Sequence, residues 1–396
     1  MTSAPTNPSK SFMNVLQLIS SAGFYGAENV VLELASELKT LGINCTLGVF
    51  NNLRNPHLEL TQFGKAREIQ THLFDCRGQA DWRTLVQLGR YLRSERIDLV
   101  HTHGYKSNLY GLAVSRFMGK PSISTCHNWI SNDLKTQAYY LIDKTILPRF
   151  SHVVGVSSKI VDELLRIHVP AKKVSMISNG INLSRFAAEG SNLRAEFKIG
   201  PFESVVGVVA RMTPEKGLIH LIEAAKSVLQ EMPGTRFLLV GDGPLRNELE
   251  KKVAQLEISS QVLFVGPRQD MPEVYRTLDF FVLPSLNEGL PMALLEAMAS
   301  SRAVVVTGVG EIPQLIRPSQ EGLLIPPGDS RAISTALTQL MHNRNLSSTL
   351  ARNALARVTE LCSSRRMCEQ YLKLYTELHR RSRNTPGSLK AERGGK

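Results

Sequence analysis

The chain of 396 residues is longer than a single hydrophobic core usually supports, so we expect two domains. Its composition, 42% hydrophobic and 21% charged, excludes the fibrous and the wholly disordered classes. The net charge of +12 is uneven: residues 1–183 carry +7 and residues 380–396 carry +5, whereas residues 184–379 are neutral. The first half and the tail therefore favour an anionic partner or membrane surface, and the neutral second half argues against a nucleic-acid partner.

Residues 1–11 are polar and lack the basic cluster and apolar core of a secretory signal, so we expect a disordered lead-in. No apolar run approaches the roughly 18 to 20 residues that a membrane span needs. The five cysteines have no metal-binding or redox spacing, which indicates reduced structural thiols. We expect a cytoplasmic protein, able at most to associate peripherally with the inner face of the cell membrane.

Short β-branched and Leu-rich runs alternate with longer amphipathic stretches along the chain, which predicts parallel sheets. The first series of expected strands covers residues 12–19 (followed by a helix over 27–41), 43–50, 98–101, 122–126 and 153–156. Turn chemistry at 179–182 ends this series. A second series follows at residues 204–209, 236–240, 261–265, 279–283 and 303–307.

This pattern predicts an α/β protein with two doubly wound Rossmann-like domains facing each other across a cleft. The first domain is expected over residues 12–183 and the second over residues 184–362. A final helix over about 363–379 carries aromatic and aliphatic residues at helical spacing, which indicates core packing. A basic flexible tail, residues 380–396, is expected to end the chain.

The loop after strand 204–209 carries the first chemical signal, since ligands of doubly wound sheets bind beyond the carboxyl ends of strands. It reads Ala-Arg-Met-Thr-Pro-Glu-Lys-Gly and contains Arg211 and Lys216 ahead of an amphipathic helix. A guanidinium can fork onto one phosphate while an ammonium neutralises the next, and the helix N-terminus adds a favourable dipole. The two cations suit a diphosphate, although alone they could also be solvated loop residues.

A second signal follows strand 279–283. Glu288 precedes Gly289 and a helix expected to start near Pro291, and Glu296 lies about a turn and a half inside that helix. A carboxylate beside bare backbone amides at a helix N-terminus suits hydroxyl groups and phosphate oxygens. The alternative is that Glu288 only caps the helix and that Glu296 is solvated.

Together, Arg211-x4-Lys216-Gly217 and Glu288-x7-Glu296 resemble the paired signatures of the retaining glycosyltransferases of family 4 (glycosyl transferases group 1), which have the GT-B fold. The segment Gly241-Asp242-Gly243-Pro244 looks like the strand-to-helix loop of the family's nucleotide domain. The resemblance covers most of the chain, from the glycine loop near residue 23 to the final helix. It implies that this helix packs back on the first domain.

The resemblance implies transfer of a hexosyl or N-acetylhexosaminyl group, with retention of configuration, from a UDP- or GDP-linked donor. The acceptor would be a hydroxyl of a glycan or lipid-linked molecule in cell-surface polysaccharide or glycolipid synthesis. Arg211 and Lys216 would hold the diphosphate, and Glu296 the ribose. Glu288 and the backbone of three following residues would meet the sugar, namely Gly289, Leu290 and Pro291. Gly266 and Arg268 would lie against the nucleobase, and neither a metal nor another cofactor is expected.

In the first domain, the segment that contains Gly26 looks like the family's glycine loop, although this chain has Tyr25-Gly26 where many members have two glycines. His127 resembles the family's histidine that faces the donor sugar. His101 and His103 form a His-x-His pair, but no third ligand follows at a convincing spacing for a metal. We expect this pair to line the acceptor side or to support the loop.

Residues 51–66 and 128–150 mix basic with aromatic and aliphatic side chains, as segments that meet lipid head groups do. The residues in question are Arg54, Lys65, Trp129, Lys135, Tyr139, Tyr140, Lys144, Ile146 and Arg149. They favour an anionic membrane surface and a lipid-linked or polysaccharide acceptor. A solvated basic surface explains the same residues equally well.

Three other classes remain as alternatives. A non-catalytic sugar-nucleotide-binding protein could keep the fold, but it would not need the two cations and two carboxylates together. A GT-B epimerase would convert the donor without an acceptor, and a phosphorylase would need a pyridoxal-bearing lysine, for which there is no signal. A nucleic-acid-binding protein is suggested by charge alone, without the interleaved aromatic and basic residues of an RNA-binding sheet.

Overall fold

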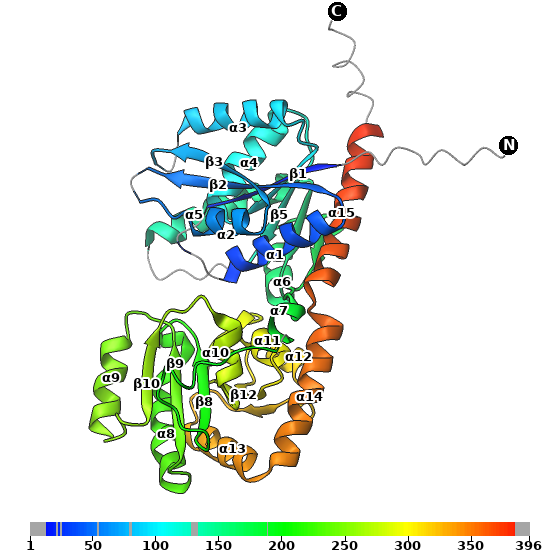
Figure 1. The fold of residues 1–396 in the computed structure, drawn as a ribbon. Helices are drawn as coiled ribbons and strands as arrows, with labels where there is room; N and C mark the ends of the chain where they lie inside the picture. The colour runs from blue at the N-terminus through cyan, green and yellow to red at the C-terminus, as the bar shows by residue number, and fades with distance from the viewer. Residues whose placement is uncertain are drawn as a thin grey trace, which may run out of the picture. The chain divides into compact units, whose positions relative to one another are not determined.

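The computed structural model describes residues 13–20, 23, 26–53, 55–78, 81–127, 134–187 and 189–384, apart from the side chains of residues 134–138. The chain divides into two compact units, one formed by residues up to Ile177 and from Met367 onwards, the other by Ser178–Arg366. Figure 1 shows a parallel sheet flanked by helices in each unit. The predicted two-domain α/β fold is confirmed. The predicted lead-in and residues 385–396 of the predicted tail lie outside the described residues.

Unit 1 holds a seven-stranded sheet in the order β3-β2-β1-β4-β5-β6-β7. Its strands are β1 (Asn14–Ile19), β2 (Asn44–Asn52), β3 (Gln70–Cys76), β4 (Leu99–His103), β5 (Ser122–Cys126), β6 (His152–Gly155) and β7 (Val174–Met176). Its helices are α1 (Gly26–Thr40), α2 (Glu59–Ala66), α3 (Trp82–Ser94), α4 (Tyr105–Phe117), α5 (Leu134–Ile146) and α6 (Ser158–Arg166), with short 3-10 turns at Leu147–Arg149 and Ala171–Lys173.

Unit 2 holds a six-stranded sheet in the order β10-β9-β8-β11-β12-β13. Its strands are β8 (Ser204–Val209), β9 (Thr235–Val240), β10 (Val262–Gly266), β11 (Phe280–Leu283), β12 (Ala303–Thr307) and β13 (Leu323–Ile325). Its helices are α7 (Leu183–Ala187), α8 (Leu218–Glu231), α9 (Arg246–Gln255), α10 (Met271–Thr277), α11 (Met292–Ala299), α12 (Ile312–Leu315), α13 (Ser330–His342) and α14 (Arg344–Leu361), with a 3-10 turn at Pro214–Lys216.

The central strands β8, β11 and β12 are buried on both faces, which is why they read as continuous apolar runs rather than as alternating ones. In unit 1, side chains of β1 alternate between two layers. Leu16 and Leu18 pack in the cluster that includes Leu88 of α3 and Val114 of α4. Gln17 points to the opposite face, since successive side chains of a strand alternate.

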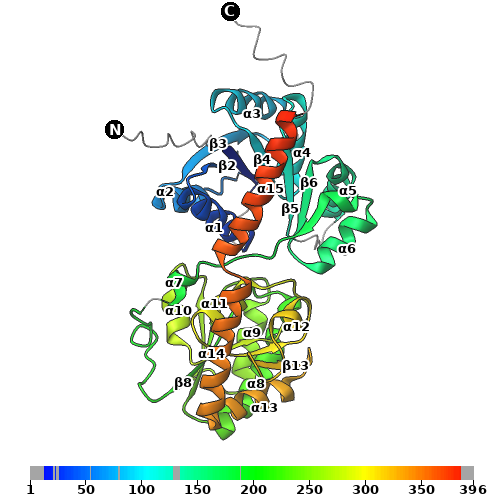
Figure 2. The same cartoon turned by 90° about the vertical axis from the view of Figure 1, so that its right-hand side faces the viewer.

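The last helix, α15 (Ser364–Asn384), lies mostly in unit 1, and Figure 2 shows it across strands β4 and β5. It runs on to Asn384 rather than ending near residue 379. Met367, Tyr371, Tyr375 and Leu378 are buried, which confirms that its apolar stripe packs as core. All five cysteines of the chain are buried and free, in agreement with structural thiols.

Three observed strands, β3, β7 and β13, were missed by the prediction. Each is an edge strand with a neighbour on one side only. Strands β7 and β13 have three residues each, and β3 mixes polar with apolar side chains. Edge strands need no continuous apolar run, so hydrophobic patterning indicates them weakly.

The loop after β9 depends on a glycine that no other residue can replace without strain. Gly241 has a φ of 128°, and a Cβ built there would lie 2.0 Å from the carbonyl oxygen of Ala210. Gly241→Ala is expected to lower the free energy of unfolding by about 2 kcal/mol or more, because the methyl group meets backbone in a region that only glycine adopts readily. Urea unfolding followed by circular dichroism measures this loss.

Gly234→Ala is the matched control, since nothing lies within 4 Å of a Cβ at that position. Equal losses in the two variants would contradict the strain argument.

Candidate functional site

Two of the predicted site residues, Lys216 and Glu288, meet at the carboxyl edge of the second sheet. Strands β8 and β11 are hydrogen-bonded neighbours, so the loops that follow them lie side by side. Lys216 Nζ donates to Glu288 Oε1 at 2.6 Å, and the hydroxyl of Ser285 donates to the same oxygen at 2.8 Å. The Glu288 side chain is only 8% exposed and that of Lys216 is 21% exposed, so solvent screens this pair little.

A glycine allows these two loops to touch. Gly217 has a φ of 60°, and a Cβ there would lie 2.3 Å from the carbonyl oxygen of Pro284. Next to it, the amide of Leu286 donates to the carbonyl of Glu215 at 2.8 Å. The backbone contact fixes the distance between the loop of Lys216 and that of Glu288.

The loop after β12 holds Glu288 from the other side. Gly310, at a φ of 59°, approaches so closely that a Cβ would lie 2.1 Å from the carbonyl oxygen of Glu288. The amide of Glu311 donates to the carbonyl of Gly289 at 3.2 Å, and Thr307 Oγ1 donates to the carbonyl of Ser285 at 2.6 Å. Loops after three adjacent strands therefore position a single carboxylate.

Arg211 begins the loop after β8 and has an exposed side chain. The backbone beside it is fixed, because the amide of Met212 donates to Asp242 O at 2.9 Å and that of Leu245 donates to Met212 O at 3.0 Å. These bonds tie the Arg211 loop to the Gly241-Asp242-Gly243 loop after β9. The guanidinium is thus presented from an anchored backbone at the same edge of the sheet as Lys216.

Glu296 is buried in α11 and is not the solvated helix residue of the alternative interpretation. The phenol of Tyr275 donates to Glu296 Oε2 at 2.9 Å and lies 3.1 Å from the carbonyl oxygen of Ala293. Burial, and next the neighbouring negative charge of Glu296, raise the pKa of Tyr275 well above its ordinary value, so the phenol stays a donor. Tyr275 was not predicted, because its partner Glu296 lies 21 positions away and no local pattern links the two.

The other predicted donor-side residues lie at the same edge of this sheet. Pro291 precedes the first residue of α11, Leu290 is half-buried and Gly289 is exposed. Gly266 ends β10 at a φ of 73°. Arg268 follows it and is held in ion pairs with Glu196, at 2.7 Å, and with Asp270. Its guanidinium is therefore committed to neighbouring carboxylates, and its contact with a nucleobase stays a prediction.

In unit 1, Gly26 is the first residue of α1, and the three predicted histidines lie together on one side of the sheet. His127 Nε2 lies 3.2 Å from His103 Nδ1, and His103 Nε2 lies 2.7 Å from Gln17 Oε1. Gln17 in turn donates from Nε2 to the hydroxyl of Tyr375 at 2.9 Å. This chain of hydrogen bonds connects the end of β5 to the last helix.

His101 continues the same chain in the interior. Its Nδ1 lies 2.6 Å from the hydroxyl of Tyr375, and its Nε2 lies 2.7 Å from Thr125 Oγ1, which is 2.9 Å from the hydroxyl of Tyr371. His101 is fully buried, which favours the second of its two expected roles, support of the structure, over lining the acceptor side. Strand β4 extends to His103, and His101 faces the two tyrosines of α15.

The direction of the hydrogen bonds follows from Gln17. Because Oε1 of Gln17 only accepts, His103 Nε2 must carry a proton, and Nδ1 of a neutral His103 must accept. His127 Nε2 then donates to His103, which leaves Nδ1 of His127 as a hydrogen-bond acceptor. The glutamine thereby selects one tautomer of His127.

All three histidines are held neutral. Burial, and next the charge of His127, lower the pKa of His101 to about 3, and burial lowers the pKa of His127 to about 4. The pKa of His103 lies well below its ordinary value for the same reason, with the two other histidines adding to the effect. At neutral pH the group offers hydrogen bonds without positive charge.

The residues expected to meet a membrane are only partly described. Lys144 pairs with Glu163 at 2.6 Å, and the ring of Tyr139 stacks on Tyr105 at 5.0 Å between centroids. Arg54, Trp129 and the Lys135 side chain lie outside the described residues. No helix within the described residues is long and apolar enough to cross a membrane, and no group of three or more metal-binding side chains was found among them.

Each of the two units is matched by a model of a known protein family. The family model for glycosyltransferase family 4 matches residues 24–185, and the model for glycosyl transferases group 1 matches residues 203–343. The crystal structure of HepE from Anabaena, solved in complex with UDP and glucose, superposes with a TM-score of 0.80 at 20% identity. It covers 92% of this chain and 100% of that one.

Two curated relatives are similar in sequence. UDP-Gal:alpha-D-GlcNAc-diphosphoundecaprenol alpha-1,3-galactosyltransferase of Escherichia coli is 28% identical over 69% of this chain and 75% of its own length. Lipopolysaccharide core biosynthesis mannosyltransferase LpsB of Rhizobium meliloti is 31% identical over 47% of this chain and 56% of its own length. With the two family models, these similarities show that the chain belongs to the group 1, family 4 glycosyltransferases and has their GT-B fold.

Proposed function

We propose that the protein is a retaining glycosyltransferase that moves a hexosyl or N-acetylhexosaminyl group from a nucleoside-diphosphate sugar to a hydroxyl of a lipid-linked glycan. The product would serve cell-surface polysaccharide or glycolipid synthesis. The observation that carries the proposal is the contact between Lys216 and Glu288, held by three neighbouring loops in unit 2. It puts a cation for a diphosphate next to a carboxylate for a sugar.

The proposed chemistry uses the cations on the leaving group. As the bond between the anomeric carbon and the diphosphate oxygen breaks, negative charge grows on that oxygen, and Lys216 and Arg211 stabilise it. The acceptor hydroxyl attacks from the same face of the sugar and forms the new C–O bond. Its proton passes to the departing phosphate oxygen, so that neither a protein base nor a metal is required.

Glu288 is proposed to accept hydrogen bonds from sugar hydroxyls. Its Oε1 already accepts two hydrogen bonds from Lys216 and Ser285, which fixes the orientation of the carboxylate. Glu296 is proposed to bind the ribose, since Tyr275 holds its Oε2 in place. A carboxylate held by its neighbours pays little ordering entropy when a hydroxyl binds.

We further propose UDP as the nucleotide and a lipid diphosphate as the carrier of the acceptor. This proposal is supported by the donor and acceptor in the name of the Escherichia coli galactosyltransferase. A GDP-linked donor is the alternative. Such an acceptor would place the enzyme at the cytoplasmic face of the membrane.

His127 is proposed to orient a hydroxyl of the sugar or acceptor through Nδ1, the atom that the chain of hydrogen bonds leaves as an acceptor. A neutral imidazole is suited to this role, because its unprotonated nitrogen accepts a hydrogen bond from a hydroxyl without adding charge. His103 and Gln17 are then positioning residues that act through His127.

The direct test of the activity is a reaction of the full chain with UDP- and GDP-linked sugars, each with and without a GlcNAc-diphosphate-lipid acceptor. We expect one sugar to be transferred, with an α-linked product from an α-linked donor in the proton NMR spectrum. A β-linked product would contradict retention. Donor conversion without the acceptor would favour an epimerase, and nucleotide binding without any turnover would favour the non-catalytic protein.

The different contacts proposed for Lys216 and Glu288 predict different losses. Lys216→Ala is expected to weaken UDP binding at least tenfold and to lower kcat/KM by about 10²–10³, since it removes charge stabilisation of the leaving group. Glu288→Gln is expected to bind UDP as well as the wild type but to lose transfer to a similar extent. Calorimetric titration with UDP and initial rates separate the two effects.

Lys251→Ala is the control, because Lys251 is exposed on α9 away from both loops. If Lys216→Ala bound UDP as tightly as this control, the diphosphate role of Lys216 would be wrong.

The tautomer of His127 offers a test of the hydrogen-bond chain. In the wild type at pH 7, nitrogen-detected NMR is expected to show His127 protonated at Nε2, and the rate is expected to be unaffected by His127 above pH about 5, since its pKa is about 4. Gln17→Glu keeps an acceptor for His103 Nε2 and should preserve the tautomer. Gln17→Leu removes the acceptor and is expected to lower kcat about tenfold with a mixture of tautomers.

The opposite result for the wild type, a proton on Nδ1 of His127, would show that the hydrogen bonds from His127 to Gln17 run in the reverse direction. His127 would then be a donor, and the proposed role of Gln17 would fail.

A further inference from the structure

Helices α3 and α4 of unit 1 expose large apolar side chains to solvent, in addition to the apolar side chains that they bury in the core. On α3, Trp82 is 70% exposed and Val86, one turn later, is 40% exposed. On α4, Leu109 is 42% exposed and Phe117, two turns later, is 88% exposed. Residues three to four positions apart lie on one side of a helix, so each helix carries an outward apolar stripe in addition to its buried one.

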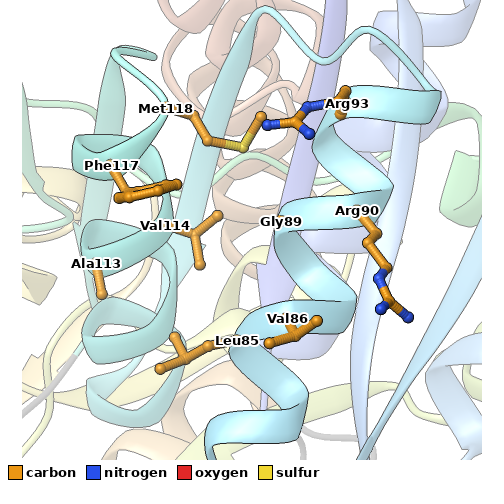
Figure 3. A pocket seen from close by; sticks show the side chains of 9 residues that line it. All are labelled: Leu85, Val86, Gly89, Arg90, Arg93, Ala113, Val114, Phe117 and Met118. Carbon is orange, nitrogen blue, oxygen red and sulfur yellow. The ribbon is translucent and has the colours of Figure 1, made fainter.

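Val86 from one stripe and Phe117 from the other line a hollow of about 390 Å³ between the helices. Figure 3 shows Phe117 and Val114 of α4 on one side of this space and Leu85 and Val86 of α3 on the other. Gly89 contributes to the opening, since it adds no side chain at a position where a Cβ would lie 3.8 Å from the side chain of Val114. The surface therefore offers both protruding rings and an apolar recess.

The charges around this surface have one sign. Neither α3 nor α4 contains an acidic residue, and together they contain Arg83, Arg90, Arg93, Lys106 and Arg116. Lys106 is buried, whereas the four arginines are exposed. Figure 3 shows Arg93 beside Met118 at one end of the hollow and Arg90 pointing outward from α3.

Two acids flank α3, one at each end of the helix. Asp81 caps the helix by accepting from the amide of Arg83 at 3.0 Å, and Glu95 follows its last residue. Neither Arg90 nor Arg93 forms an ion pair with a described carboxylate. Unpaired arginines beside exposed aromatic rings are suited to an anionic surface that also admits apolar groups.

We propose that the α3–α4 surface, meaning the outward faces of these two helices with the hollow between them, docks the enzyme on an anionic phospholipid bilayer. Trp82 and Phe117 insert at the level of the head groups, and Arg90 and Arg93 bind phosphates. The inference rests on the proposed function in one respect, since a lipid-linked acceptor requires the enzyme to work at a membrane.

The same charges disfavour a second copy of this chain as the occupant. In a symmetric dimer through this face, equivalent patches would meet and arginines would lie opposite arginines without acids to separate them. A bilayer with anionic head groups supplies the missing opposite charge over the whole patch. It also takes up aromatic side chains that would otherwise stay in water.

The test is flotation of the full chain with vesicles of phosphatidylcholine containing 0 or about 30% phosphatidylglycerol. The wild type is expected to float only with the anionic vesicles, and high salt is expected to weaken this binding. Arg90→Glu/Arg93→Glu is expected to lower binding at least about tenfold, since each arginine near such a surface contributes on the order of 1 kcal/mol. Phe117→Ser is expected to weaken binding at constant charge.

Arg331→Glu/Arg352→Glu is the matched control, because it reverses two exposed charges in unit 2. The proposal is overturned if the wild type binds neither kind of vesicle, if it binds both equally, or if the control loses as much binding as Arg90→Glu/Arg93→Glu. A concentration-dependent dimer in light scattering that Phe117→Ser abolishes would assign the surface to a second copy instead.

The variants also separate this surface from catalysis. With a detergent-dispersed acceptor, Arg90→Glu/Arg93→Glu is expected to transfer sugar at the wild-type rate, while its rate on vesicle-borne acceptor falls with its binding. If vesicle binding fails but dispersed acceptor is used normally, only the docking surface is wrong. If the wild type transfers sugar to neither form of the acceptor, but its vesicle binding is lost in Arg90→Glu/Arg93→Glu, the proposed function is wrong and the docking surface stands.

Discussion

The close approach of the loops after β8 and β11 is the constraint on which the candidate site depends. These strands are neighbours in the sheet, and Gly217 lets one loop lie against the carbonyl of Pro284. The contact leaves Lys216 and Glu288 2.6 Å apart, with Gly310 holding Glu288 from the far side. A site built on backbone contacts of this kind keeps its geometry without help from flexible side chains, which favours electrostatic stabilisation of a leaving group.

In unit 1, hydrogen bonds between side chains, rather than contacts between loops, orient the candidate site residues. Its histidines carry no charge at neutral pH, because burial holds their pKa values low. Their orientation comes from hydrogen bonds that run from His127 through Gln17 to Tyr375. The last helix therefore contributes more than packing, since it supplies a phenol to this chain. In this account unit 2 provides charge and unit 1 provides neutral, directed hydrogen bonds.

Features that depend on neighbouring residues could be predicted from the sequence, whereas contacts between residues far apart in the chain could not. The strands before Arg211 and Glu288 were located because an apolar run followed by a glycine-containing loop is a local pattern, and the roles of both residues came from the family resemblance. The hydrogen bond between Gln17 and Tyr375 spans 358 positions, so no local pattern could indicate it. The hydrogen bond between His101 and Tyr375 could not be predicted for the same reason, although Gln17 inside an apolar strand was an available signal of a buried polar contact. The edge strands β3, β7 and β13 were not predicted, because an edge strand needs no continuous apolar run.

The central claim is that Lys216 and Glu288 act as one unit on one donor, and a double-mutant cycle on kcat/KM tests it most directly. The rates of the wild type, Lys216→Ala, Glu288→Gln and the double variant would be compared with the same donor and acceptor. The account predicts strong coupling, with the double variant no more than about threefold slower than the slower single variant, because residues that act together lose their effect together. Losses that multiply in the double variant would show that the two residues act independently and would contradict the account.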